Sequence, residues 1–282
     1  MSLPDRLTLG AAALAVADLD RAVDFYTNTL GMIELARDGD TVSVGAGQNP
    51  LIHLIRQPGA KTQPPRSTGL YHVAILLPTR ADLGHALLKV DRSGWSFQGF
   101  GDHFVSEASY LSDPDGNGLE IYRDRPRETW TFNGDSVNMG TAELDVRGIV
   151  AEVANPQAAW QMPAETVIGH LHLRVGDVNA GDAFYRGLLG FDVMVKMPSA
   201  YFFSAGGYHH HLGTNHWQSH GVGAPPADSV GLRWWTVNLP DSADVTAVEA
   251  RLRAAQRITT PVSGGFEARD PWGTAVRVVT AS

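Results

Sequence analysis

The chain repeats itself at long range, and this repeat restricts the folds open to it more than any other feature of the sequence. A Val-Ala-Asp-Leu-Asp stretch at 16–20 is followed by Phe-Tyr and Leu-Gly pairs. A related stretch at 175–179 is followed by the same pairs, 159 residues further on. The Asp-Pro motif at 113–116 recurs at 270–273. This self-similarity predicts two diverged copies of one structural unit.

Each copy divides again into two similar segments. In the first segment, an alternating strand over 7–16 precedes Asp18, a predicted helix N-cap, and the helix that follows ends at Gly31. Three short strands complete the segment, and the same order starts again near residues 70, 168 and 231. The sequence therefore predicts an α+β fold of four βαβββ modules. The expected ranges are a first domain over 1–123, an ordered connector over 124–166 and a second domain over 167–282.

Charge and composition narrow the function classes. A net charge of -8 argues against nucleic acid and anionic membranes as main partners. The chain has no cysteine, which removes disulfides, thiolate metal sites and a cysteine nucleophile. The sequence shows neither an N-terminal leader pattern nor an apolar run of about 18 residues, so we expect a cytoplasmic protein.

A turn followed by a short strand presents one acidic side chain. The Asp-Pro-Asp-Gly-Asn-Gly stretch at 113–118 has turn chemistry, because proline presets φ while glycine and asparagine tolerate positive φ. In the strand predicted over 118–122, Leu119 and Ile121 face one way and Glu120 faces the other. A carboxylate on the inner face of a curved sheet needs a proton, a cation or a metal ion. We expect a metal ion at Glu120.

Histidines on two other strands offer partners for this carboxylate. The strand that begins the third module alternates, with leucine and valine on one face and His170 and His172 on the other. His72 stands alone in an apolar strand over 70–77, where a histidine is more often a hydrogen-bonded core residue than a ligand. Two imidazoles and one carboxylate on one face of an octahedral ion form the triad of Fe(II) sites that activate oxygen. His72, Glu120 and His170 are therefore the predicted metal ligands, although their spacing forms no local motif.

An internal run of three histidines at 209–211 is the most unusual local feature. A run of this kind can arise by chance. If 208–213 is a strand instead, His209 and His211 share one face and His210 points the opposite way. Imidazoles beside a metal ion can then move protons near neutral pH.

These features together resemble the vicinal oxygen chelate superfamily, the group of glyoxalase I, bleomycin-resistance proteins and extradiol ring-cleaving dioxygenases. The βαβββ repeat, the Phe-Tyr…Leu-Gly pattern and the stretch at 113–120 carry this resemblance over nearly the whole chain. It implies two glyoxalase-like domains, each a curved sheet that closes toward a barrel. Motifs at 103–117, 169–173 and 207–211 are similar to those of the bacterial catechol-2,3-dioxygenase subgroup.

The resemblance implies a reaction and a role for each residue. It implies an Fe(II) enzyme, with Mn(II) as the alternative ion, that opens a small aromatic diol with O2 to a muconic semialdehyde. His72, Glu120 and His170 match the family's metal ligands. The resemblance assigns a substrate hydrogen bond to Tyr110 and proton transfer to His209. The remaining candidates, with less support, are His211 beside the metal and His103 and His172 in the substrate pocket.

The chain departs from the family pattern in one respect. In well-known extradiol enzymes the ligands come from the third and fourth modules, but here the fourth module has Trp234 in place of His72 and Arg277 in place of Glu120. The first module has Ala11 where the third has His170. We therefore expect the second and third modules to pair across the connector and build one site. The first and fourth modules are then expected to pair without a metal.

Two other functions stay open at this level. A glyoxalase-like metal-dependent isomerase or thiol transferase usually presents a four-ligand set rich in carboxylates. The sequence instead has His211 at the position expected for the fourth ligand. A metal-free binding protein of the bleomycin-resistance type lacks the triad altogether. The substituents of the catechol are not determined by these patterns, and exposed sheet edges in this architecture favour a homodimer.

Overall fold

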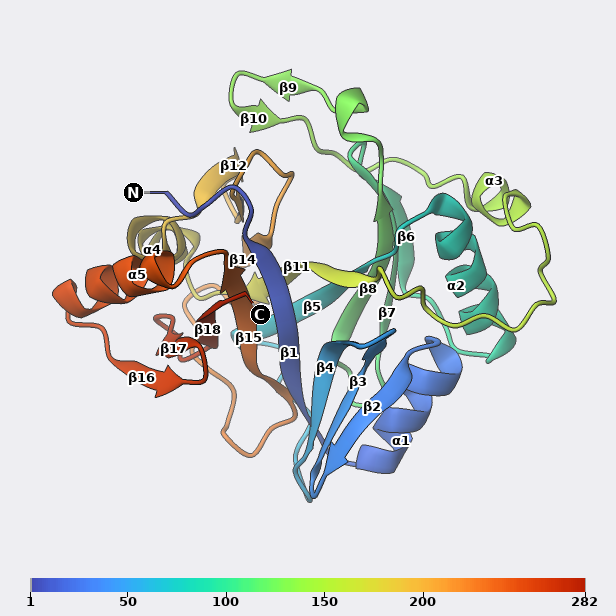
Figure 1. The fold of residues 1–282 in the computed structure, drawn as a ribbon, viewed down its shortest axis with the longest axis horizontal. Helices are drawn as coiled ribbons and strands as arrows, with labels where there is room; N and C mark the ends of the chain where they lie inside the picture. Colours follow the sequence, from blue (N-terminus) through green and yellow to red (C-terminus); the bar gives the residue numbers. More distant parts are fainter. Residues whose placement is uncertain (1, 282) are drawn as a thin grey trace.

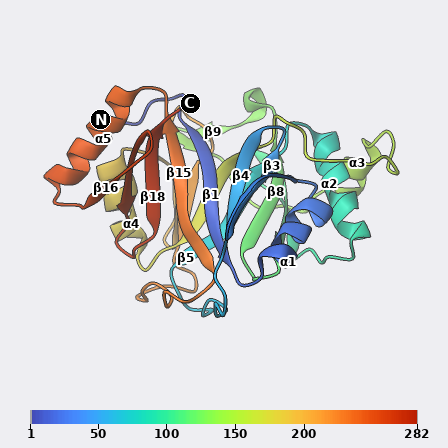
Figure 2. The same ribbon diagram turned by 60° about the horizontal axis from the view of Figure 1, so that its bottom comes forward.

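Two curved sheets of eight strands each carry the fold (Figures 1 and 2). The structure is a computed structural model that describes residues 2–281, so Met1 and Ser282, which end the predicted domain ranges, lie outside the described residues. Short helices lie outside the sheets, with α4 and α5 at one end and α1, α2 and α3 at the other. The predicted α+β class is confirmed.

Neighbouring strands within each sheet come from distant parts of the chain. In spatial order, the first sheet consists of β16 (Thr259–Val262), β17 (Gly265–Arg269), β18 (Ala275–Thr280), β15 (Gly231–Leu239), β1 (Thr8–Val16), β4 (Asn49–Arg56), β3 (Thr41–Ala46) and β2 (Ile33–Asp38). The second consists of β12 (Asp192–Lys196), β13 (Ala200–Ser204), β14 (Leu212–Asn215), β11 (Val167–Arg174), β5 (Gly69–Leu76), β8 (Gly118–Asp124), β7 (Ser106–Ser112) and β6 (Gly99–Asp102).

Each module contains one helical segment after its first strand, as predicted, and the connector adds two short ones. The helical segments are α1 (Leu19–Asp24) with its π-helical continuation η1 (Phe25–Thr29), α2 (Arg80–Arg92), η2 (Arg127–Thr129), α3 (Val146–Ala151), α4 (Val178–Phe184) with η3 (Tyr185–Leu189), and α5 (Ser242–Ala254). Asp18 caps α1 by accepting a hydrogen bond from the Arg21 backbone nitrogen, as predicted. Gly31, with φ of +84°, follows the end of η1.

Each sheet takes strands from both copies of the repeat. In the first sheet, β1 of the first module pairs antiparallel with β15 of the fourth. In the second sheet, β5 of the second module pairs antiparallel with β11 of the third. The expected pairing of modules is therefore confirmed, and β1 and β15 lie side by side in Figures 1 and 2. The division into domains at 1–123 and 167–282 stays a prediction.

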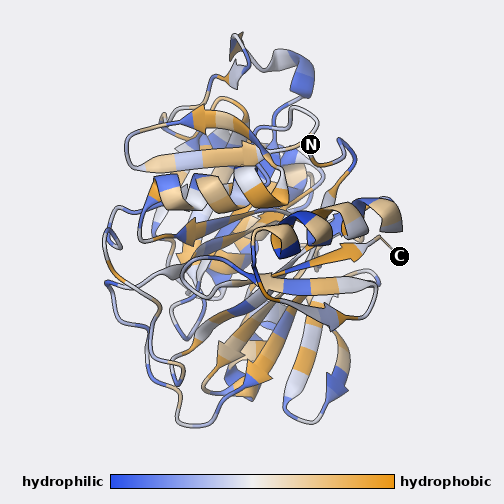
Figure 3. Cartoon of the chain, turned by 90° about the vertical axis from the view of Figure 1, so that its left-hand side faces the viewer, coloured by the Kyte–Doolittle hydropathy of each residue, from blue (hydrophilic) through white to orange (hydrophobic). Residues whose placement is uncertain are grey.

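The alternation of each central strand separates a core face from a polar face. Leu171 and Leu173 on β11, and Leu119 and Ile121 on β8, are buried in the main hydrophobic core. The residues between them project from the opposite face of the sheet. Figure 3 shows this interleaving of hydrophobic and hydrophilic residues along the strands. The hydrophobic core therefore packs against one face of the sheet, and the other face is free to line a cavity.

A buried tyrosine–aspartate hydrogen bond joins the two modules of each copy. The Tyr26 hydroxyl donates to Asp113 Oδ2 over 3.1 Å, and the Tyr185 hydroxyl donates to Asp270 Oδ2 over 2.8 Å. The other oxygen of Asp113 accepts from two backbone nitrogens of its own turn, and Asp270 does the same. The repeated Phe-Tyr and Asp-Pro motifs are thus two ends of one contact. In the first copy this contact fixes the turn that leads into β8.

The segment over 124–166 crosses between the two copies. It contains η2, a small hairpin of β9 (Phe132–Asn133) and β10 (Ser136–Val137), and α3, which packs on α2. Trp130 and Ile149 are buried, whereas Phe132 is exposed. Within residues 2–281, no helix is long and apolar enough to cross a membrane.

Candidate metal centre

Strand pairing in the second sheet brings polar side chains into one row. The pairing of β11 with β5 sets His170 opposite Ala74, and that of β5 with β8 sets Ala74 beside Glu120. The pairing of β8 with β7 extends the row to Tyr110. Residues in such a row project from the same face of the sheet, and His72, two residues before Ala74, shares that face. Because Ala74 has only a methyl group, space is left between His170 and Glu120.

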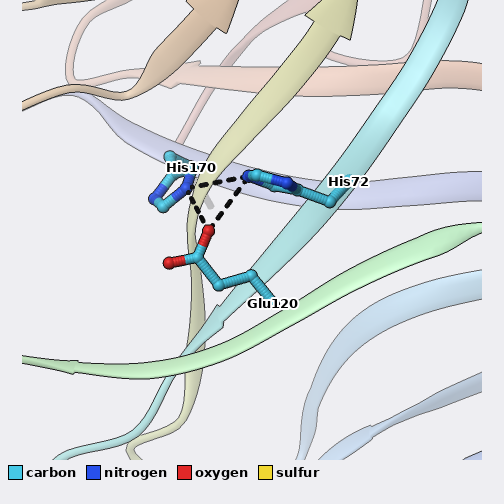
Figure 4. Close-up of side chains that lie close together, drawn as sticks. All are labelled: His72, Glu120 and His170. Atoms are coloured by element: carbon cyan, nitrogen blue, oxygen red, sulfur yellow. Dashed lines mark hydrogen bonds and ion pairs between the residues drawn. The ribbon is translucent and has the colours of Figure 1, made fainter. Parts of the chain in front are cut away.

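The three predicted ligands meet in this space (Figure 4). The distance from Glu120 Oε2 to Nε2 is 3.0 Å for His72 and 3.1 Å for His170, and the two Nε2 atoms are 3.3 Å apart. All three side chains are buried, with at most 6% of any residue exposed. Adjacent ligand atoms of an octahedral ion with bonds of about 2.1 Å lie about 3 Å apart. The arrangement therefore fits one small metal ion.

Burial and neighbouring charges set the protonation states of this triad. Burial opposes ionisation of Glu120, but the adjacent imidazoles outweigh it and hold the pKa of the carboxyl well below its usual range. Burial lowers the pKa of His170 to about 4, against the opposing effect of Glu120. Near pH 7 the acid is therefore an anion and His170 is neutral. These are the forms in which carboxylates and imidazoles bind metal ions.

The position of a fourth ligand differs from the prediction. His72 and His170 occupy equivalent positions in the second and third modules. In the second module, Ala74, two residues after His72, pairs with Glu120. In the third module, His172, two residues after His170, pairs with Gly213. The equivalent of Glu120 is therefore Gly213, and the interpretation of His211 as this position is wrong. A side chain at Gly213 would meet the His172 ring at 2.9 Å, so the position holds no fourth ligand.

The triad opens onto a cavity of about 700 Å³. Its wall contains the triad together with the predicted residues Tyr110, His103 and His172. Burial lowers the pKa of His172 well below its ordinary value, so this ring is neutral near pH 7. Tyr71, Phe202 and Trp217 add aromatic side chains to the wall. The cavity is thus lined by aromatic side chains as well as by the candidate metal ligands.

Tyr110 and His103 form one hydrogen-bonded unit beside the triad. The Tyr110 hydroxyl lies 2.7 Å from His103 Nε2, and His103 Nδ1 lies 2.8 Å from the Gly140 carbonyl oxygen. A carbonyl only accepts, so His103 Nδ1 donates to Gly140, and in the tautomer with its proton on Nδ1 the ring can accept from the Tyr110 hydroxyl at Nε2. Burial, together with the charge of Glu120, raises the pKa of Tyr110 well above its usual value. The phenol therefore stays protonated at neutral pH.

The histidine run does not form the strand that 208–213 was expected to form. Gly206 and Gly207 have φ of +61° and +64°, so the chain turns before the histidines, and β14 begins only at Leu212. Among the described residues that line the cavity is His210, but neither His209 nor His211. The His210 ring centre is 4.1 Å from that of His170. The prediction from strand alternation, which placed His209 and His211 on the metal side, is therefore wrong, and His210 faces the cavity instead.

The two other histidines of the run lie behind the cavity wall. His209 is fully buried; its Nε2 lies 2.9 Å from Asp124 Oδ1, and its Nδ1 lies 2.8 Å from His210 Nδ1. His211 Nδ1 lies 2.9 Å from the Ser204 hydroxyl. The sequence analysis therefore missed His210 as the cavity residue. The glycine pair at 206–207 was the signal that a turn, and not a strand, precedes it.

The equivalent place in the first sheet is filled by other side chains. Thr236 on β15 pairs with Arg277 on β18, as Ala74 pairs with Glu120 in the second sheet. The Arg277 guanidinium lies over the Trp234 ring at 3.8 Å and bonds Glu267. A cation stacked on an aromatic ring is favourable. The predicted pairing of the first and fourth modules is confirmed, and the absence of a metal there stays a prediction.

The sequence of this chain is similar to a known family and to a named relative over most of its length. The Glyoxalase/Bleomycin resistance protein/Dioxygenase superfamily matches residues 8–121 and 167–278. A protein named catechol-2,3-dioxygenase from Bacillus subtilis (strain 168) is 40% identical over 275 residues, which cover 96% of each chain. The chain therefore belongs to the glyoxalase/bleomycin resistance protein/dioxygenase superfamily.

Solved structures show that the fold is shared more widely than the sequence. A crystal structure of a putative dioxygenase from Bacillus subtilis subsp. subtilis str. 168 has a TM-score of 0.67 at 14% identity, covering 99% of this chain and 86% of the other. Glyoxalase I from Zea mays has a TM-score of 0.59 at 17% identity, covering 97% and 92%. At these identities the likeness describes the two-sheet architecture alone.

Proposed function

We propose that this protein is an extradiol ring-cleaving dioxygenase. Fe(II), with Mn(II) as the alternative ion, is held by His72, Glu120 and His170, and a catechol is opened with O2 to a muconic semialdehyde. The observation that carries this proposal is the convergence of two imidazoles and one carboxylate on the wall of a large cavity. The 40% identity to the Bacillus subtilis catechol-2,3-dioxygenase supports the same reaction.

A metal ion held by the triad would bind both substrates, the catechol and O2. When bound, the ion would bring the two catechol oxygens and O2 together at one centre. The overall reaction adds both atoms of O2 to carbons of the catechol ring and forms no by-product. Because Glu120 is the one carboxylate in the triad, it would leave a bound divalent ion with a net positive charge, which would favour a deprotonated catechol.

His210 is the residue that we propose for proton transfer, with His209 as a positioning residue behind it. Asp124 accepts from His209 Nε2, and in the tautomer with its proton on Nε2 the His209 ring accepts at Nδ1 from His210 Nδ1. This chain leaves His210 Nε2 without a proton. Burial lowers the pKa of His210 well below its usual range, so the ring is neutral near pH 7. His210 can then accept a catechol proton and return it to the opened product.

Tyr110 is proposed to orient the substrate beside the triad. Its hydroxyl oxygen lies 2.7 Å from His103 Nε2 and lines the cavity. A catechol hydroxyl can donate to this oxygen and so be aligned for the reaction. His172 remains a proposed pocket residue, because it lines the cavity next to the triad.

The cavity wall fits a flat aromatic substrate. Tyr71 and Trp217 meet edge to face with ring centres 5.5 Å apart, and Phe202 stands next to His172. Rings in these orientations stack on or around another aromatic ring. A volume of about 700 Å³ exceeds what a single six-membered ring fills, so substituted catechols are included in the proposed substrate class.

Iron loading and oxygen labelling test the proposal directly. Protein loaded anaerobically with Fe(II) should retain about one ion per chain and turn catechol into a yellow semialdehyde in air. With ¹⁸O2, both labelled atoms should appear in the product. Turnover of a methylglyoxal–thiol adduct with nickel or zinc, and none of catechol, would support the glyoxalase-type alternative instead.

A matched pair of glutamate variants tests the triad. Glu120→Gln removes the anionic ligand and should abolish both iron retention and turnover. Glu143→Gln changes an exposed glutamate of the connector and should alter neither. Iron retained at wild-type stoichiometry by Glu120→Gln would contradict the proposed ligand set.

A further inference from the structure

A second group of metal-binding side chains lies outside the cavity. It consists of Asp177, His216 and His220, whose candidate ligand atoms all lie within 4.8 Å of one another. We call these three residues the outer cluster. Asp177 and His216 are half-buried and His220 is exposed. Neither histidine nor the aspartate lines the main cavity among the described residues, so the outer cluster is separate from the triad.

The outer cluster arises from a single helical turn that follows β14. The His220 backbone nitrogen donates to the His216 carbonyl oxygen over 3.1 Å, which closes one turn of helix. Residues four apart on a helical turn lie on the same side, one above the other. The two imidazole ring centres are accordingly 4.7 Å apart, with the rings nearly perpendicular. The four-residue spacing therefore places both imidazole rings where they can bind the same ion.

Asp177 is held beside this turn by its role at the start of α4. One carboxylate oxygen accepts from the Ala180 backbone nitrogen over 2.7 Å, which caps the helix. A carboxylate has capacity for further partners. Within residues 2–281, no lysine or arginine forms an ion pair with Asp177. The remaining negative charge is therefore available to a cation.

The backbone around the outer cluster is fixed without any ion. The Ser219 hydroxyl donates to the Val175 carbonyl oxygen over 2.8 Å, and the Gly221 nitrogen donates to the Gly176 carbonyl oxygen over 2.9 Å. Close packing adds to this, because a side chain at Gly176 would meet Trp272 Nε1 at 2.3 Å. A cluster whose ligands are already oriented loses little conformational freedom when an ion binds.

One atom of the outer cluster is unsatisfied. His216 Nδ1 is buried and has no hydrogen-bond partner among the described residues. A buried polar atom without a partner carries a desolvation cost that a bound ion or a water molecule can relieve. The histidine is therefore in an environment that a bound ion and its water ligands would complete.

We propose that the outer cluster is a second metal site that binds Zn²⁺ or a similar transition-metal ion. Two imidazoles and one carboxylate are zinc ligands, and the exposed side of His220 leaves a fourth position for water. Calcium and magnesium prefer sites made of oxygen ligands, so two imidazoles disfavour them. This site is independent of the proposed function, because none of its residues belongs to the reaction centre.

Zinc binding by single variants tests this proposal. Equilibrium dialysis against ZnCl2 should show one ion fewer per chain for His220→Ala than for the wild type, or a loss of affinity of at least about tenfold. Asp177→Asn should show the same loss while the helix keeps its cap, because asparagine also caps helices well. His85→Ala removes a histidine far from the cluster in sequence and should bind zinc like the wild type.

A triad variant separates the two sites. Glu120→Ala should lose the ion of the triad and keep the zinc that His220→Ala loses. Circular dichroism checks that each variant is folded, and substitution of the exposed His220 is expected to leave the fold intact. Unchanged zinc stoichiometry and affinity in both His220→Ala and Asp177→Asn would overturn the proposal, whatever the outcome at the triad.

Discussion

At Glu120, burial and two neighbouring imidazoles act on one carboxylate in opposite directions. Burial disfavours the anion, and the imidazoles favour it and prevail. Among the described residues, its ion-pair partners are His72 and His170, and no arginine or lysine is one of them. A metal ion would add the positive charge that this group of side chains lacks. The preference for a cation is therefore built into the side chains themselves.

Proton transfer provides the first prediction at this scale. His210→Gln should lower turnover by about 10² or more, the usual contribution of a general acid or base, and leave iron content unchanged. His209→Gln should lower turnover less, because it removes only the group that orients His210. Steady-state kinetics with iron analysis of each variant measures both effects. A larger loss in His209→Gln than in His210→Gln would reverse the proposed order.

The second prediction concerns acid stability and His211. Burial lowers the pKa of His211 to about 3, and its Nδ1 accepts from the Ala205 backbone nitrogen. In the unfolded chain a histidine takes up a proton near pH 6.5, whereas the folded state resists it down to about pH 3. Stability is therefore fully present above about pH 6.5 and is lost as the pH falls toward 3.

His211→Asn measures this loss. Asparagine offers an oxygen acceptor in place of Nδ1 but does not titrate in this range. The free energy of unfolding, determined with urea at pH 7.5 and pH 5, should fall less for His211→Asn, by up to about 1.4 kcal/mol per pH unit below 6.5. Equal falls in the two proteins would show that His211 does not resist protonation in the folded state.

Residue-level prediction succeeded where alternation applies and failed where it does not. Strand periodicity gave the correct faces for His72, Glu120 and His170, because all three lie inside regular strands. His210 was assigned to the wrong face, since the chain turns at Gly206 and Gly207 before β14 begins. Three-dimensional proximity between distant strands has no local pattern, so the distances within the triad could not be predicted at all.

At the scale of elements, the tyrosine–aspartate contact links a helix to the turn that precedes a ligand-bearing strand. In the first copy the contact leads to β8 and Glu120, and in the second copy it leads to β18, where Arg277 stands instead. The two contacts are alike in geometry and burial. Tyr26 and Tyr185 are therefore a matched pair of positions for substitution.

Tyr26→Phe and Tyr185→Phe use this pair. Each removes one buried hydrogen bond and should lower the free energy of unfolding by about 1–3 kcal/mol. Only Tyr26→Phe loosens the turn before Glu120, so only this variant should also lose iron affinity. Urea denaturation and iron titration of the two variants provide the measurement. Equal iron affinity would mean that the turn does not position β8.

Element boundaries were predicted less well than element order. The sequence analysis gave the start of each module only approximately, whereas the structure places β6 at Gly99–Asp102 and β7 at Ser106–Ser112. Phe104 has φ of +71°, so a turn falls between these two strands. This turn carries His103 to Tyr110, and no propensity of phenylalanine indicates it.

At the scale of the whole molecule, the sheets do not coincide with the copies of the repeat. The second sheet receives His72 and Glu120 from the first copy and His170 from the second. Because Trp234 and Arg277 depart from the family pattern of ligands, the sequence was enough to predict that the site combines residues from both copies. The helix packing and the path of the connector have no comparable signal in the sequence.

Dividing the chain in the exposed stretch at 154–159 should separate the ligands. A fragment ending at residue 155 contains two of the three, and a fragment starting at residue 156 contains the third. Neither alone should retain Fe(II), whereas an equimolar mixture should regain about one ion per pair of fragments. Iron analysis after gel filtration distinguishes these outcomes. Full iron retention by the first fragment alone would contradict a shared centre.

The crossed arrangement of modules also has an evolutionary consequence. After an ancestral duplication, neither daughter segment could discard its contribution to the working centre, because the other daughter held the complementary part. The opposite sheet was under no such restriction, and its corresponding positions were free to accept a stacked arginine and tryptophan. Selection would then preserve the two daughters as an inseparable pair, even while the corresponding positions of the first sheet changed.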